Sequence, residues 1–106
     1  MNSEVGLVCN MNVFTSSERD EHLKNTARLA QSIQNVQEIE QGYELVFPAE
    51  SEILSMIADF ISKERLCCPF LDFTVRVPSN TTRVKLSISG PEGTPEFLRN
   101  ELEGVF

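Results

Sequence analysis

The chain opens with an apolar segment, residues 5–14, in which hydrophobic and polar positions alternate in the second half. A period of two is typical of a strand with one buried face. We therefore expect a first strand over Val5–Phe14, with Cys9 on the same face as Leu7 and Met11. Because free cysteine is among the most buried residue types, Cys9 is first of all a core residue in this interpretation.

The next segment repeats its apolar residues with the period of a helix. Thr15 precedes it and is followed three positions later by Glu18, which is the pattern of a capping box. The helix is predicted to extend to about residues 32–35. Its apolar stripe relies on alanine and threonine, and His22 projects on that stripe rather than among the polar residues.

A second helix is predicted over about Ser51–Leu66, and its apolar stripe is the clearest in the sequence. Pro69 ends this helix, since proline cannot continue a helix and biases the preceding Cys68 toward an extended conformation. The sequence therefore places an adjacent pair of thiols, Cys67–Cys68, at a helix end.

Short alternating segments elsewhere predict strands. A turn at Gln41–Gly42 joins two of them into a hairpin, and a polar segment joins two others. A short terminal helix is predicted to start at Thr94–Pro95 and to end before Gly104. The later strands are predicted over residues 36–40, 43–48, 70–77 and 83–89.

The order strand, helix, strand, strand, helix, strand predicts an α+β fold of the ferredoxin-like split βαβ type (βαββαβ), extended by one strand and a C-terminal helix. In this topology two helices pack on one face of an antiparallel sheet, and the strand after the second helix lies beside the first strand. A length of 106 residues with 41% hydrophobic residues favours a single α+β domain over residues 1–106. The end of the second helix should then meet the start of the first.

Acidic residues outnumber basic ones by 16 to 9, which gives a formal net charge of -7. Such a charge repels phosphate backbones and anionic lipids, so we expect no nucleic-acid partner and no membrane partner. The chain has no stretch of about 18 apolar residues, and its first residues lack the basic and apolar regions of a signal peptide. These features favour a cytoplasmic protein whose three cysteines are reduced.

The thiol pair is the strongest chemical signal in the sequence. Glu64 interrupts the apolar side of the second helix about one turn earlier, and breaks of folding rules are typical of functional sites. The predicted fold brings this carboxylate and His22 to the thiols. Soft thiolates suit a soft metal or metalloid ion. The candidate ligands are Cys67, Cys68, His22, Glu64 and, as an optional partner, Cys9.

Other interpretations of these residues stay open. The chain lacks the two spaced cysteine pairs of a structural zinc site. Redox cycling of the thiols is an alternative, although the negative end of the helix and Glu64 both raise a thiol pKa and oppose a reactive thiolate. The residues could also be structural, with inert buried thiols, a half-exposed His22, and Glu64 paired with Arg19 or Lys63. No residue is assigned a catalytic role.

The segment Glu64–Phe70 reads E-R-L-C-C-P-F, and it resembles a group of small uncharacterised bacterial proteins with an E-R-x-C-C-P-F signature. The similarity covers most of the chain, including Gly42–Tyr43, Phe47–Pro48 and Gly90–Gly93. The resemblance implies a compact bacterial domain and no particular activity. A second functional class is a non-catalytic interaction module, in which the sheet pairs with another subunit or a second copy and the Cys-Cys-Pro-Phe turn is structural. An apolar exposed sheet face would favour that class.

Overall fold

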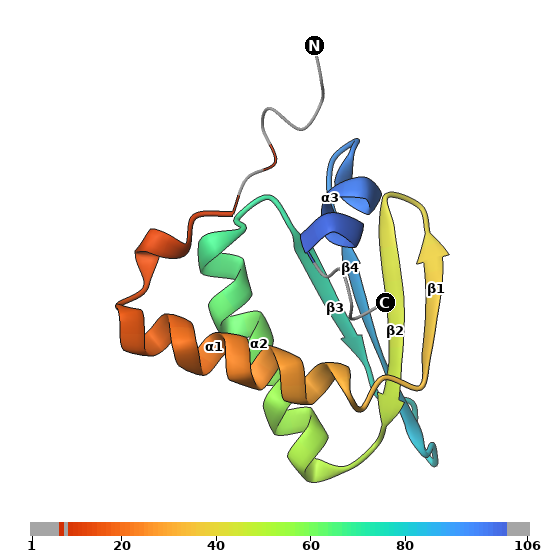
Figure 1. Cartoon of the computed structure of the whole chain (residues 1–106). Helices are drawn as coiled ribbons and strands as arrows, with labels where there is room; N and C mark the ends of the chain where they lie inside the picture. Colours follow the sequence, from red (N-terminus) through yellow and green to blue (C-terminus); the bar gives the residue numbers. More distant parts are fainter. Residues whose placement is uncertain (1–6, 8, 102–106) are drawn as a thin grey trace.

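The helices and strands lie in two layers in the computed structural model, which describes residues 7 and 9–101. Helices α1 (Ser16–Ala30) and α2 (Ser51–Cys67) lie on one face of an antiparallel sheet (Figure 1). In the described part of the chain this sheet has four strands in the order β1-β2-β4-β3. The remaining elements are β1 (Asn35–Ile39), β2 (Gly42–Pro48), β3 (Asp72–Arg76), β4 (Arg83–Ser89), the 3-10 helix η2 (Met11–Val13) and α3 (Thr94–Glu101).

The predicted fold class is confirmed: two helices pack on one face of an antiparallel, ferredoxin-like sheet, and a further helix follows the last strand. The predicted first strand is wrong in its described part, because residues 9–14 form no strand and include η2 instead. Residues 5, 6 and 8 of that prediction lie outside the described residues. The place beside β3 belongs to β4, which pairs antiparallel with both β2 and β3. The sheet is thus completed from the C-terminal side, as in a circular permutation of the predicted order.

Helix α1 begins with the predicted capping box. Thr15 Oγ1 accepts a hydrogen bond from the Glu18 N–H at 3.1 Å, and Glu18 Oε1 accepts one from the Thr15 N–H at 2.9 Å. This reciprocal pair satisfies N–H groups that a helix start leaves free. The buried side of α1 carries His22 and Leu29, whereas Leu23, predicted on the apolar stripe, is exposed. The helix therefore turns a histidine, and not this leucine, toward the interior.

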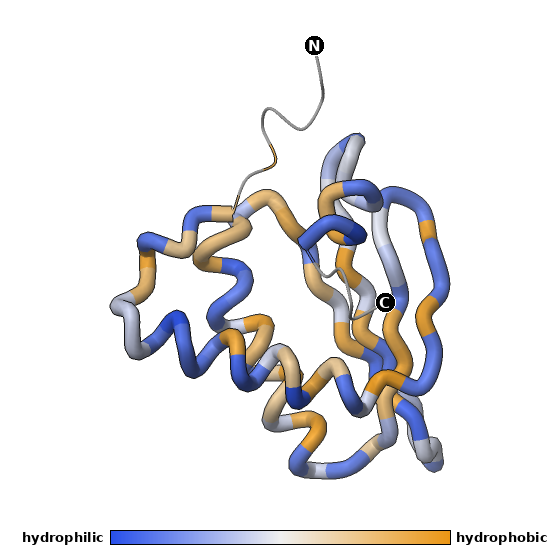
Figure 2. The backbone as a smooth tube through the Cα atoms, viewed as in Figure 1, coloured by the Kyte–Doolittle hydropathy of each residue, from blue (hydrophilic) through white to orange (hydrophobic). Residues whose placement is uncertain are grey.

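A hydrophobic core fills the space between the helices and the sheet, and Figure 2 shows the hydrophobic segments that contribute to it along both layers. Alternate residues of the central strands point into the core, because side chains of a strand alternate between its faces. Helix α3 packs on the same face, since the Arg99 guanidinium donates to the hydroxyl of Tyr43 on β2. The core residues of the central strands and of α2 include Leu45, Phe47, Val84, Leu86, Ile88, Ile53, Ile57 and Phe60.

The opposite face of the sheet is mainly polar in the described strands. The Lys85 ammonium of β4 lies 4.0 Å from the Glu44 carboxylate of β2. Val46, which is buried, and Ile39, which is half-buried, are the apolar exceptions on this face in the described strands. Other residues that point the same way, by their register with these two strands, are Gln37, Thr74, Arg76, Arg83 and Ser87. This face therefore lacks the broad apolar surface that would favour an interaction module.

Helix α2 ends at Cys67, one residue beyond the predicted end, and Pro69 follows it. Cys68 has φ -125° and ψ 72°, and its N–H donates to the Glu64 carbonyl at 2.8 Å. The Leu71 N–H then donates to the Cys68 carbonyl at 3.1 Å, which closes a turn before β3. The two thiols are therefore held between the last helical turn and a tight turn.

Candidate functional site

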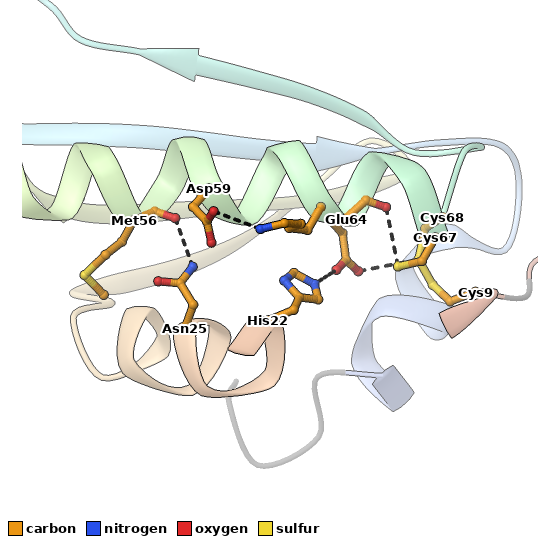
Figure 3. A network of polar contacts seen from close by, with 9 residues as sticks. Cys9, His22, Asn25, Met56, Asp59, Glu64, Cys67 and Cys68 are labelled. Carbon is orange, nitrogen blue, oxygen red and sulfur yellow. Dashed lines mark hydrogen bonds and ion pairs between the residues drawn. A yellow bond between two sulfur atoms is a disulfide. The ribbon is translucent and has the colours of Figure 1, made fainter. Parts of the chain in front are cut away.

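The thiol pair at the end of α2 lies against the N-terminal segment that carries Cys9 (Figure 3). The Asn10 N–H donates to the Cys67 carbonyl at 2.7 Å. Leu7 and Phe14, on either side of this contact in the sequence, are both buried in the core. Backbone hydrogen bonding and side-chain burial thus hold this segment at the end of α2.

Cys9 and Cys68 form a disulfide between residues 59 positions apart. The expectation that all three cysteines are reduced is therefore wrong. Cys67 is the free thiol, and Cys9, expected in the core, is only half-buried. The sequence does not predict this pairing, because alternation places Cys9 on a strand of the sheet, whereas it lies in an irregular segment beside the helix end. The odd number of cysteines is the signal that one thiol would differ from the other two.

The Cys67 thiol is buried, with 1% of the residue exposed. Its Sγ lies 3.7 Å from Cys68 Sγ, and it donates to the Glu64 carbonyl at 3.6 Å. Burial, followed by the negative charge of Glu64, raises the pKa of Cys67 to about 12. The thiol is therefore protonated at neutral pH, which confirms that the surroundings oppose ionisation, with burial as the leading cause.

Glu64 connects the sulfur atoms to His22 on α1. Its Oε1 lies 2.7 Å from His22 Nε2, and its Oε2 lies 3.4 Å from Cys68 Sγ (Figure 3). The alternative pairing with Lys63 is not found, since the Lys63 ammonium lies 3.1 Å from the Asp59 carboxylate. The carboxylate that interrupts the apolar side of α2 is thus placed between an imidazole and a sulfur.

His22 is enclosed rather than half-exposed, with 3% of the residue accessible. Its ring lies between the rings of Phe14 and Phe60, at centroid distances of 5.7 and 5.9 Å. Its Nδ1 is buried and has no hydrogen-bond partner among the described residues. The two phenylalanines were not predicted as part of the site. The signal for Phe60 is its position four residues before Glu64, which puts both on one side of α2.

Four side chains place a donor atom within 4.8 Å of one another: Cys9, Glu64, Cys67 and Cys68. His22, also predicted as a ligand, is outside this group and contacts Glu64 instead. Two sulfurs bound about 2.3 Å from a tetrahedral ion lie about 3.8 Å apart. The 3.7 Å between Cys67 Sγ and Cys68 Sγ fits that spacing. Because a disulfide occupies two of the sulfurs, only the reduced form offers the full set of donors.

A cavity of about 920 Å³ opens beside the site, between the N-terminal segment and α3. Cys9 lines this cavity, and the carboxylates of Glu92, Glu96 and Glu101 lie around it. Cys68, in contrast, is 0% exposed. Cys9 is therefore the half of the disulfide nearer to solvent, and three acidic residues line the same cavity.

No family model, no curated protein and no solved structure matches this chain. The resemblance to proteins with the E-R-x-C-C-P-F signature stays a prediction. None of the helices within residues 9–101 is long and apolar enough to cross a membrane.

Proposed function

We propose that the reduced protein binds one soft metal or metalloid ion through the three cysteine sulfurs and Glu64. The observation that carries this proposal is the convergence of four donor atoms within 4.8 Å, drawn from an irregular N-terminal segment and the end of a helix. Thiolate ligands select soft ions over hard ones, and three of the four donors are sulfur.

Burial favours a ligand role for the thiols over a catalytic one. Cys67 and Cys68 are 1% and 0% exposed, so a substrate has no direct path to either sulfur. Reactive cysteines in enzymes are partly exposed and lie in electropositive surroundings, whereas these lie beside a carboxylate. A bound cation makes the nearby carboxylate favourable, because the cation replaces the thiol protons and attracts the negative charge of Glu64.

In this proposal His22 is a positioning residue, and Glu64 is the ligand that it orients. The contact of 2.7 Å between Nε2 and Oε1 leaves Oε2 directed at the sulfurs. Partners of this kind fix the orientation of a metal ligand and typically contribute about 10–100-fold to metal affinity.

The Cys9–Cys68 disulfide favours a second function, reversible thiol oxidation. It shows that two of the three sulfurs are close enough to form a bond, with Cys67 Sγ only 3.7 Å from one of them. The high pKa of Cys67, about 12, opposes a role for this thiol as the attacking nucleophile. Oxidation is therefore better placed at Cys9 and Cys68 than at the vicinal pair.

Ion binding is tested on the full chain after reduction with a phosphine and removal of the reductant. Titration with cadmium(II), and separately with arsenite, should saturate at one ion per chain and give an ultraviolet sulfur-to-metal absorption band with cadmium. Replacing both thiols, Cys67→Ser with Cys68→Ser, should abolish that band. Circular dichroism of the variant shows whether its fold is kept.

A matched control is Lys63→Ala, which lies on the same helix but removes only an ion pair with Asp59. It should bind cadmium(II) as the unchanged chain does. The proposal is wrong if the reduced chain binds neither ion, or if the double serine variant binds with unchanged affinity and stoichiometry.

A further inference from the structure

We infer that the Cys9–Cys68 disulfide closes the ion site, so that the redox state of these two cysteines decides whether an ion is bound. This inference rests on the proposed ion-binding function. Its basis is that the same two sulfurs belong both to the disulfide and to the group of four donors. A disulfide sulfur offers no thiolate, so the oxidised form keeps only Cys67 as a free thiol.

The site can open without losing its shape, because the disulfide is not the only link between the two segments. The Asn10 N–H remains bonded to the Cys67 carbonyl at 2.7 Å in a contact that involves no sulfur. Leu7 and Phe14 anchor the same segment in the core. Reduction therefore frees Cys9 Sγ while its backbone stays beside Cys68, within reach of a shared ion.

The Glu64 carboxylate is positioned to interact with the Cys68 thiol in the reduced form. Its Oε2 lies 3.4 Å from Cys68 Sγ, so the carboxylate accepts a hydrogen bond from this thiol once the disulfide is broken. In the disulfide form the sulfur of Cys68 has no proton to donate, whereas the carboxylate keeps its contact with His22. The polar contacts around the carboxylate thus favour the reduced, binding-competent form.

The route to reduction runs through the cavity that Cys9 lines. A small thiolate attacks Cys9 Sγ, the Cys9–Cys68 bond breaks, and Cys68 leaves as a thiolate that takes a proton from water. A second small thiolate attacks the outer sulfur of the mixed disulfide and releases Cys9. Two small thiols are oxidised to one small disulfide, and two protein thiols are regained.

The reverse step requires an oxidant, and a hydroperoxide supplies it. The Cys9 thiolate attacks the peroxide oxygen, the O–O bond breaks, and an alcohol or water leaves, which gives a sulfenic acid at Cys9. Cys68 Sγ then attacks Cys9 Sγ, and a second water leaves as the disulfide forms. The ion loses two sulfur ligands and is released.

The test starts from the reduced full chain loaded with cadmium(II) and exposed to hydrogen peroxide. Bound cadmium is measured by elemental analysis after dialysis, and the disulfides are located by peptide mapping with mass spectrometry. We expect cadmium loss in step with formation of the Cys9–Cys68 bond and an affinity lowered by more than about tenfold. Reduction with a phosphine should restore binding.

Two variants with equal numbers of sulfurs isolate the effect of oxidation. Cys9→Ser and Cys67→Ser each keep two cysteines and Glu64, so both should bind cadmium(II) more weakly than the unchanged chain. Only Cys67→Ser can still form the Cys9–Cys68 bond. We therefore expect peroxide to release cadmium from Cys67→Ser and to leave Cys9→Ser loaded.

The outcomes separate this inference from the proposed function. If the reduced chain binds cadmium(II) and the oxidised chain binds it equally well, redox control is wrong and ion binding stands. Equal release from the two single variants would likewise overturn redox control. If the reduced chain binds no cadmium(II), the proposed function fails and the inference fails with it.

Discussion

The two halves of α2 bury different kinds of side chain: apolar ones in the first half, and polar ones with a thiol in the second. In the first half, Ile53 and Ile57 are buried and belong to the apolar core. The second half carries the Glu64 carboxylate, which contacts the buried His22, and the buried thiol of Cys67. Burying an apolar side chain stabilises the fold, whereas burying polar groups costs free energy unless each is satisfied. Stability and chemistry therefore occupy separate halves of one helix.

Two pairs of polar side chains that involve α2 show the same contrast. Asp59 and Lys63 lie one turn apart on the surface, with side chains 46% and 30% exposed. Glu64 pairs with His22 on another helix, and these side chains are 17% and 3% exposed. Water screens the first pair, so it contributes little. The second pair is held in a low-dielectric interior, where removing one partner and leaving the other buried has larger consequences for both stability and the site.

The largest effect on stability is expected from the apolar half. Ile57→Ala removes a side chain that is 1% exposed and should lower the free energy of unfolding by about 2–5 kcal/mol. Denaturant unfolding measures this change. The folded variant should bind cadmium(II) normally, and a tenfold loss of affinity would show that the two halves are not separate. Leu23→Ala, at a residue that is 55% exposed, is the control and should change stability by less than about 0.5 kcal/mol.

The second prediction exchanges the buried pair for apolar side chains. The double variant His22→Phe with Glu64→Leu should be as stable as the unchanged chain or more stable by about 1–4 kcal/mol, because it avoids the cost of burying polar groups. Its affinity for cadmium(II) should nevertheless fall by about tenfold or more. Unfolding and titration are measured on the same sample.

The single variant Glu64→Leu sharpens this prediction. It leaves His22 Nε2 buried without its partner and should therefore be less stable than the double variant. If the double variant is less stable than the unchanged chain, or less stable than Glu64→Leu, the pair is a net contributor to stability. The contrast between the two halves of α2 would then be wrong.

The third prediction concerns the pH dependence of the disulfide form, in which Cys67 is the thiol that titrates. The folded chain raises the pKa of Cys67 from 9.0 to about 12, so the neutral thiol is favoured in the native state. This contribution is fully present below the unfolded pKa and is lost as the pH rises from about 9 toward 12. Cys67→Ser lacks the titrating group. The difference in unfolding free energy between the two chains should shrink over this range, and a constant difference would contradict the buried-thiol interpretation.

The smallest effect is expected at the surface pair. Lys63→Ala removes the contact of 3.1 Å with Asp59 and should cost about 0.3–0.5 kcal/mol. The cost should decrease in high salt, because exposed charges are screened. Unfolding at low and high ionic strength measures both values. A loss above about 1 kcal/mol would mean that the exposed pair contributes as a buried one does.

Much of the site was predictable because its parts carry local signals. The break in the apolar pattern at Glu64 and the position of His22 on the stripe of α1 correctly brought the two together. Topology then placed the thiol pair beside them. Cys9 was the exception, since it was placed on a strand by alternation alone, and its partner lies 59 residues away. Alternation reports which side chains share a face and carries no information about which strand, if any, pairs with the segment.

The sequence by itself determined the elements whose causes are local. The Thr15–Glu18 capping box begins α1, Pro69 follows the end of α2, and β4 has the predicted bounds. These features depend on hydrogen bonds and backbone restrictions within a few residues. They would be recognisable in any chain that contained the same segments.

Only the tertiary structure decided which segment completes the sheet and which sulfurs meet. β4 takes the central position between β2 and β3, and the segment at residues 9–14 lies instead against the end of α2. Both outcomes depend on contacts between segments that are far apart in the sequence, which no local pattern encodes. The disulfide between Cys9 and Cys68 requires such a contact, because it joins residues 59 positions apart.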